Sequence, residues 1–197
     1  EQTMKNFIRI FITLAVAGTI TSCDLALQRN DEYTGSTLDI YQHKTCWEYM
    51  ESRPDLFTSM MDGLELCGMT DYYTQTATTY TYLLLTETAI AEKVAAAKVD
   101  PEQLQELKDI FLFHIIKGEY HAYGILTYNV TYVDTLLGGE SKMSMVLQQA
   151  ASDRNKIDRL NLMTNCGSST VVTAVASNYI MTNGPAHILD DICVYIK

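Results

Sequence analysis

The 197-residue sequence lacks the short motifs that mark common catalytic and cofactor sites. It contains no H-E-x-x-H zinc motif, no P-loop, no G-x-G-x-x-G fingerprint and no G-x-S-x-G nucleophile elbow. Its cysteines never occur at C-x-x-C spacing, which argues against a zinc site. Histidine is also scarce, with only four residues in the whole chain. We therefore predict that the chain is not an enzyme and has no catalytic residues, no metal and no cofactor.

Charged residues are scarce as well, at 19% of the chain against 47% hydrophobic residues. This balance is typical of a globular protein and argues against a disordered one. The formal net charge of −10 gives the chain no electrostatic reason to approach nucleic acid or an anionic lipid surface. The length allows one domain, or one domain with a leader and a tether.

The beginning of the sequence has the layout of a secretory signal. A basic start at Met4–Arg9 leads into Ile10–Ile20, an apolar run that is too short to span a bilayer. We set aside the three residues before Met4, because Met4 is the plausible initiator. The segment Ile20–Cys23 resembles the lipobox of bacterial lipoproteins, in which the cysteine is acylated. The alternative is an ordinary secretory signal with an incidental cysteine.

The lipobox resemblance implies three parts of the chain. Residues 1–22 would be a lipoprotein signal peptide, residues 23–38 a tether acylated on Cys23, and residues 39–197 the folded domain. The palmitate-containing lipid on Cys23 would be the chain's contact with the membrane, because several acyl chains anchor a protein firmly. We expect this anchor in the outer membrane of a Gram-negative bacterium, on its periplasmic or cell-surface face.

Four further cysteines, Cys46, Cys67, Cys166 and Cys193, leave two interpretations open. Export permits disulfides, and a Cys46–Cys67 bridge would join two helices while a Cys166–Cys193 bridge would join two strands. Four cysteines allow three pairings, however. The other interpretation is four small buried thiols.

Hydrophobic spacing and turn residues predict helices in the first part of the domain and strands in the second. The expected helices are Cys46–Met50, one that starts at Pro54 and runs to about Leu64, Ala89–Lys98, and one that is capped by Asp100 and ends at Lys117–Gly118. The expected strands are Thr76–Leu85, Met143–Leu147, Leu160–Leu162, Val171–Val175 and Ile188–Ile196, with turns at Gly138–Gly139 and Asn183–Gly184. This order predicts an α+β domain with antiparallel strands.

Three segments of the domain resemble the motifs of the fasciclin (FAS1) family. They are Thr81–Ile90, Phe111–Tyr120 and Thr182–Asp190, and the turn at Thr135–Gly139 also matches. The likeness covers roughly Leu38–Lys197 and implies a wedge-shaped β-sandwich with short helices packed at one end. The chain departs from the family pattern at Leu85 and Lys117, which stand where relatives often have proline, at Ile90, which replaces a phenylalanine, and at Phe113, which replaces a tyrosine.

The resemblance assigns structural roles to six motif residues, Thr86, Glu87, His114, Asn183, Gly184 and His187. The two histidines have a functional alternative, as a general base or as metal ligands together with Glu87 or Asp190. We favour the structural interpretation, in which each ring nitrogen bonds a backbone group or Thr86 or Glu87 inside the core.

Tyrosine is abundant, and eight of the 13 tyrosines lie in the middle of the chain. They could form a platform that binds sugar or peptide, or they could fill the core and favour strands, which we prefer. The eight are Tyr72, Tyr73, Tyr80, Tyr82, Tyr120, Tyr123, Tyr128 and Tyr132.

The expected function follows from the lipid signal and the fasciclin likeness together. We expect a membrane-anchored extracytoplasmic lipoprotein that acts as an adhesion or interaction module and binds a protein or a glycan. The alternative is an accessory structural subunit of an outer-membrane transporter or surface assembly.

Overall fold

The structure is a computed structural model, and it describes residues 40–122, 130–139, 142–147, 157–158, 172 and 174–195. All of these residues belong to one unit, residues 39–197. The predicted leader, the tether and the acylation site at Cys23 lie outside the described residues. So do Cys166 and the strand expected at Leu160–Leu162.

Helices form most of the first half of the described chain. They are α2 (Cys46–Glu51), α3 (Pro54–Leu66), α4 (Thr70–Thr74), α5 (Glu87–Ala97) and α6 (Pro101–Phe113). Their starts follow local chemistry: Thr45 and Glu48 form a capping box at α2, and the Asp100 side chain accepts the Glu102 N–H at α6. Proline stands at the first position of both α3 and α6, as the sequence predicts.

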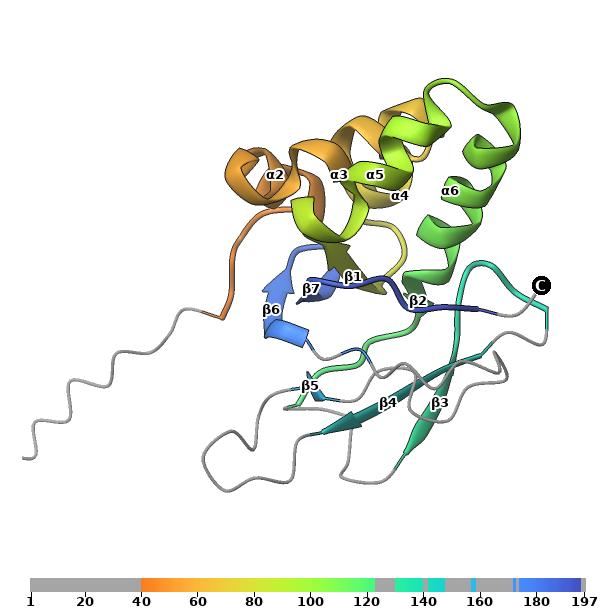
Figure 1. The fold of residues 1–197 in the computed structure, drawn as a ribbon. Coiled ribbons are helices and arrows are strands. Elements are labelled where there is room, and N and C mark those ends of the chain that lie inside the picture. The colour runs from red at the N-terminus through yellow and green to blue at the C-terminus, as the bar shows by residue number, and fades with distance from the viewer. Residues whose placement is uncertain are drawn as a thin grey trace, which may run out of the picture. The chain divides into compact units, whose positions relative to one another are not determined.

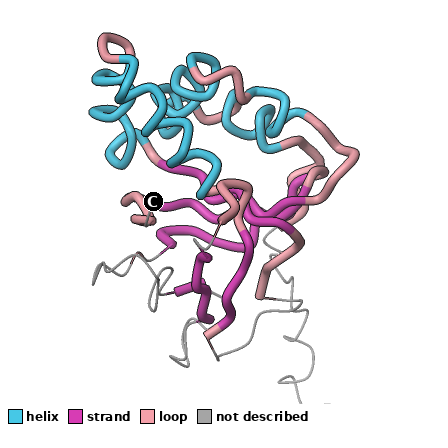
Figure 2. The backbone as a smooth tube through the Cα atoms, turned by 90° about the vertical axis from the view of Figure 1, so that its right-hand side faces the viewer, coloured by secondary structure: helices cyan, strands magenta, loops and turns pink. Residues whose placement is uncertain are grey.

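The strands form two sheets. The four-stranded sheet has the order β2 (Ile115–Lys117), β1 (Tyr80–Leu85), β7 (Gly184–Leu189) and β6 (Ala174–Met181). The three-stranded sheet has the order β3 (Thr131–Asp134), β4 (Lys142–Leu147) and β5 (Ile157–Asp158). The helices gather on one side of the four-stranded sheet, and β3 and β4 lie on its other side (Figures 1 and 2). The predicted α+β class is confirmed.

The core lies between the helices and the two central strands. Strand β7 is buried along its whole length, and β1 is buried from Thr81 onward, as expected for central strands that are covered on both faces. On the helical side, α3 packs against α5 and α6, and the close approach is possible because Gly63 has no side chain. Among the described residues, no helix has both the length and the apolar character that a bilayer span requires.

Three details of the sequence prediction are wrong. The last long helix ends at Phe113 rather than at Lys117, and Ile115–Lys117 is strand β2, antiparallel to β1. The final strand ends at Leu189, and Asp191–Tyr195 continues without regular structure. The strands are not all antiparallel, because β1 and β7 pair in parallel, with Leu83 opposite His187.

Two smaller differences concern the edges of elements. The strand expected at Thr76–Leu85 begins only at Tyr80, because α4 and a bend come before it. In β6 the expected alternation of buried and exposed side chains is shifted, since Ala174 is buried while Val175 is 49% exposed. Burial by neighbouring elements, and not the hydrophobicity of the residue itself, decides which face of the strand points inward.

Candidate functional site

His114 is the first of the two histidines to which the sequence assigns a role. It is fully buried and lies directly after the last residue of α6. Its Nδ1 lies 2.8 Å from the carbonyl oxygen of Ile110, and its Nε2 lies 3.1 Å from the backbone nitrogen of Cys193. A carbonyl can only accept and an N–H can only donate, so the ring must carry its proton on Nδ1 and accept through Nε2. His114 thus joins α6 to the C-terminal segment.

His187 is buried on β7 with the opposite proton placement. Its Nδ1 lies 3.1 Å from the backbone nitrogen of Asn178 and accepts from that N–H. Its Nε2 lies 2.9 Å from the carbonyl oxygen of Tyr120 and donates to it. Neutral imidazole satisfies both contacts, whereas a second ring proton would face the Asn178 N–H. His187 thus joins β7 to β6 and to the segment after β2.

Both histidines are held neutral by their surroundings. Burial lowers the pKa of His114 to about 4, and the bond to the Ile110 carbonyl opposes this shift. Burial also lowers the pKa of His187 to about 4, and the bond to the Tyr120 carbonyl opposes this shift. In each ring both nitrogens engage backbone groups, and neither Thr86 nor Glu87 is a partner. A ring whose two nitrogens both form backbone hydrogen bonds has no free nitrogen for a substrate or a metal.

Thr86 and Glu87 stand at the start of α5 and contact other groups. The Glu87 carboxylate accepts the backbone N–H of Ser59 at 2.9 Å and also the Ser59 hydroxyl, so it links α5 to α3. The Thr86 N–H donates to the carbonyl of Leu189 at 2.9 Å, which joins the end of β1 to the end of β7. Asp190, the other carboxylate proposed beside a histidine, is exposed.

Asn183 lies in the two-residue turn between β6 and β7, which Thr182 and Asn183 form, and Gly184 is the first residue of β7. The Asn183 side chain is buried, and its Oδ1 accepts the Cys46 N–H at 3.0 Å, at the start of α2. Its Nδ2 donates to the carbonyl of Tyr73 at 2.8 Å and lies 3.2 Å from the Tyr82 hydroxyl. One amide therefore connects the hairpin to α2, α4 and β1.

Three of the cysteines belong to the described residues, and all three are buried. Cys46 and Cys67 are free thiols, so no Cys46–Cys67 bridge is present in the structure. Burial raises the pKa of the Cys46 and Cys67 thiols, which keeps them protonated and unreactive. The alternative of small buried thiols thus describes Cys46 and Cys67. The expected partner of Cys193, Cys166, lies outside the described residues.

The mid-chain tyrosines do not act as one group. Tyr73 and Tyr82 are fully buried with ring centroids 5.1 Å apart, while Tyr80 and Tyr120 are half-buried. Tyr132 is 49% exposed. Tyr72 is 37% exposed, and Tyr123 and Tyr128 lie outside the described residues. Core filling therefore accounts for the two fully buried rings.

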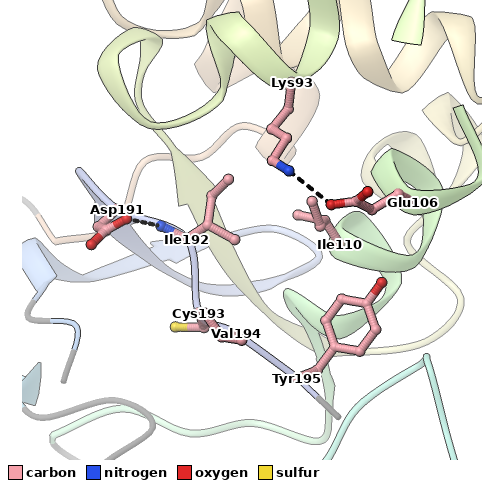
Figure 3. Close-up of a pocket in the computed structure, with 8 residues that line it drawn as sticks. All are labelled: Lys93, Glu106, Ile110, Asp191, Ile192, Cys193, Val194 and Tyr195. Carbon is pink, nitrogen blue, oxygen red and sulfur yellow. Dashed lines mark hydrogen bonds and ion pairs between the residues drawn. The ribbon is translucent and has the colours of Figure 1, made fainter. Parts of the chain in front are cut away.

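A pocket of about 510 Å³ lies between α5, α6 and the segment that follows β7. Figure 3 shows its lining: α5 contributes Lys93, and α6 contributes Glu106 and Ile110. The C-terminal segment contributes the remaining lining residues, Asp191, Ile192, Cys193, Val194 and Tyr195. The bond from Cys193 to His114 holds this segment in place, as does the contact between the rings of Tyr195 and Phe113, whose centroids lie 5.5 Å apart.

The rim of the pocket is charged and its floor is apolar. Lys93 Nζ lies 2.8 Å from Glu106 Oε1, and the two side chains are 43% and 35% exposed. On the C-terminal segment, Asp191 Oδ1 accepts the N–H of Ile192 at 2.7 Å. Burial, and then the nearby carboxylates of Asp109 and Glu106, raise the pKa of the Tyr195 phenol, so the ring stays neutral.

The sequence does not point to this pocket. Lys93 and Glu106 lie on different helices, so no helical spacing brings them together. The sequence places Tyr195 within the final strand, but that strand, β7, ends at Leu189. The cavity forms where the facing sides of α5 and α6 meet the chain that follows Leu189. Among the described residues, no group of three or more His, Cys, Asp and Glu side chains could hold a metal ion.

Comparisons with known proteins give a similarity to solved structures alone. No family profile matches the chain. No curated protein matches it either. Among solved structures, the chain is similar to a FAS1 domain pair from the insect cell adhesion molecule Fasciclin I, with 15% sequence identity and a TM-score of 0.42. The similarity covers 74% of this chain and 43% of the length of that chain.

Proposed function

We propose that this chain is a lipid-anchored extracytoplasmic protein that binds a protein or glycan ligand and catalyses no reaction. The observation that argues against catalysis is the state of His114 and His187. They are the two residues that the sequence suggests for acid–base or metal chemistry. In each of them both ring nitrogens form hydrogen bonds with backbone groups inside the core. These contacts favour a structural role for both residues.

The anchor is supported by the sequence. Cys23 follows an aliphatic residue, two small residues and an apolar run after a basic start, which is the lipobox pattern. A chain with a net charge of −10 has little attraction to anionic lipid headgroups, so membrane attachment depends on the acyl chains. The motif residues around Thr86, His114 and Asn183 support a fasciclin-like domain, a class known for adhesion.

The first experiment tests the anchor. The full chain is expressed in a Gram-negative host and compared with Cys23→Ser, with Cys67→Ser as the control that removes a thiol elsewhere. We expect the wild type and the control in the membrane fraction, with an acylated Cys23 at the mature N-terminus by mass spectrometry. The Cys23→Ser chain should leave the membrane fraction. An unmodified Cys23 in the wild type would end the lipoprotein assignment.

The binding role is tested by a pull-down from membranes that have been solubilised in mild detergent. A free binding module should purify alone and retain immobilised glycans or surface proteins. A subunit of a transporter or surface assembly should instead co-purify in fixed stoichiometry with its partner proteins. Turnover of any substrate by the purified chain, lost in a pocket or histidine variant, would contradict a purely binding role.

A further inference from the structure

We propose that the pocket between α5, α6 and the C-terminal segment binds a primary ammonium group carried on an apolar chain or ring. This inference adds a site and a ligand class to the proposed binding module. It does not depend on the lipid anchor, because every residue of the pocket lies in the described domain.

The shape of the pocket suits a small apolar body. Its volume of about 510 Å³ falls within the usual range for small-molecule sites. Ile110, Ile192 and the ring of Tyr195 lie around its centre in Figure 3 and offer an apolar floor. The floor is fixed by its contacts, since the Cys193 N–H donates to His114 and the Phe113 and Tyr195 rings pack together. The ligand would therefore enter a preformed site.

The charges of the pocket favour a cation. Of the three charged side chains that line it, Lys93 is neutralised by its contact with Glu106. Among the described residues, Asp191 has no salt-bridge partner, and its one hydrogen bond comes from the N–H of Ile192. The rim thus carries one excess negative charge, in a chain whose net charge is −10. Both the local and the overall field attract a cation.

Two further features separate an ammonium from other ligands. An ammonium group has three N–H donors, and the rim offers it the carboxylate oxygens of Asp191 as acceptors. The neutral Tyr195 ring can also receive a cation on its face. A carboxylate ligand of the same size would find only Lys93, and it would have to displace Glu106 to bind there. The pocket should therefore discriminate by the sign of the charge.

The test is a titration of the full chain in detergent micelles, followed by the backbone amide signals in ¹H–¹⁵N NMR spectra. The probes are benzylammonium, benzyl alcohol and benzoate, which share one apolar body and differ in charge. We expect benzylammonium to shift the amides of Ile110 and Ile192–Tyr195, with a Kd on the order of 1 mM. The neutral and anionic probes should bind at least about tenfold more weakly.

Variants connect the binding to the pocket. Asp191→Asn keeps an oxygen for the Ile192 N–H and removes the charge, and we expect it to weaken benzylammonium binding about three- to tenfold. Asp62→Asn is the matched control, because Asp62 pairs with Lys98 outside the pocket, and it should leave the affinity within about twofold. Added salt should weaken binding to the wild type.

A second arm identifies the source of the ammonium. N-acetyl-lysine N-methylamide stands for the side chain of a partner protein, and benzylammonium for a free amine. Binding of either probe at the pocket amides, weakened by Asp191→Asn, supports the proposal. Equal binding of benzoate, or an affinity that Asp191→Asn leaves unchanged, would overturn it. The anchor and pull-down experiments would keep their results in that case, since neither involves this pocket.

Discussion

At the scale of single residues, the two buried histidines have opposite tautomers because their backbone partners are arranged oppositely. His114 donates through Nδ1 to a helix carbonyl, whereas His187 donates through Nε2 to Tyr120. In both rings the remaining nitrogen receives a backbone N–H. Each ring is therefore used as a neutral cross-link, and protonation would replace an acceptor with a donor that faces another donor.

Gly184 is a second single residue on which the fold depends, because its position does not accept a side chain. Its φ is +136°, and a Cβ atom at this position would lie 1.8 Å from the carbonyl oxygen of Tyr80. That oxygen belongs to the backbone of β1 and cannot turn aside. Any side chain here must therefore separate β7 from β1, in addition to the strain of the left-handed backbone.

We predict that Gly184→Ala lowers the free energy of unfolding by more than about 3 kcal/mol or prevents folding. The control is Gly138→Ala, because Gly138 also has a positive φ of +73° but a Cβ there would meet no atom within 4 Å. It should cost only about 1 kcal/mol. Urea unfolding followed by circular dichroism measures both. Equal losses in the two variants would show that the contact with Tyr80 does not matter.

Sequence alone predicts part of this residue-scale picture. An Asn-Gly pair between apolar runs indicates a hairpin turn, and β6 and β7 do form a hairpin there. Its two loop residues are Thr182 and Asn183, one position earlier than the pair predicts, and Gly184 already belongs to β7. The partners of the Asn183 side chain could not be predicted, because they come from α2, α4 and β1, which lie more than 100 residues away in the chain. A turn is a local property, whereas these hydrogen bonds require the finished fold.

At the scale of elements, the approach of α3 to α5 and α6 depends on Gly63. A Cβ atom there would lie 2.8 Å from Val94 Cγ2 and 2.9 Å from Phe111 Cζ. Gly63 lies within α3 and is buried, so alanine would favour the helix but would crowd its two neighbours. Overpacking of a tight core costs about 1–3 kcal/mol, which exceeds the gain in helix propensity.

We predict that Gly63→Ala destabilises the protein by about 1–2 kcal/mol and that Val94→Ala partly offsets this loss. Val94→Ala alone leaves a cavity and should cost about 1–3 kcal/mol. In the Gly63→Ala background it should cost clearly less, because the new methyl group fills part of the space. A double-mutant cycle in urea measures the coupling. Strictly additive losses would show that the two side-chain positions do not meet.

The sequence predicts the start of α6 correctly but not its end. The spacing of Leu104, Leu107 and Phe111 predicts α6 correctly, and its start at Asp100–Pro101 follows from capping. The sequence places its end too late, because Ile115 and Ile116 extend the apolar pattern of the helix. They are buried by pairing with β1 instead, and a short apolar run does not reveal whether a helix face or a strand partner will cover it.

At the scale of the whole molecule, the parallel pairing of β1 with β7 joins two strands whose paired residues lie more than 100 residues apart in the chain. It places the end of β1 beside the end of β7, where the chain then continues along α6 and closes the pocket. The order of elements predicts the α+β class, because helices and strands have different periods. It does not predict which distant strands become neighbours, and the pocket depends on that choice.

The two histidines also make the stability of the whole domain depend on pH. Their pKa values are about 4 in the folded chain, below the ordinary value of 6.5 that applies after unfolding. Between these values the unfolded chain binds more protons than the folded chain, so acid favours unfolding. The stabilisation is fully present above pH 6.5 and is lost as the pH falls toward 4. The pKa values of three carboxylates, Glu48, Asp55 and Asp134, are also lowered. The stability that these carboxylates contribute is lost at a more acidic pH than the stability that the histidines contribute.

We therefore predict a loss of about 2 kcal/mol per histidine, or about 4 kcal/mol in total, in the free energy of unfolding between about pH 7 and pH 5. Urea unfolding at the two pH values measures it.

His114→Gln should halve this pH dependence, because one of the two titrating groups is gone, although its stability at neutral pH will be lower. His43→Asn is the control, since His43 is exposed with a φ of 50°, a backbone conformation that asparagine tolerates. It should keep the full dependence. A wild-type stability that is flat across this pH range would mean that water reaches both rings in the folded state, and the histidines would again be available for chemistry.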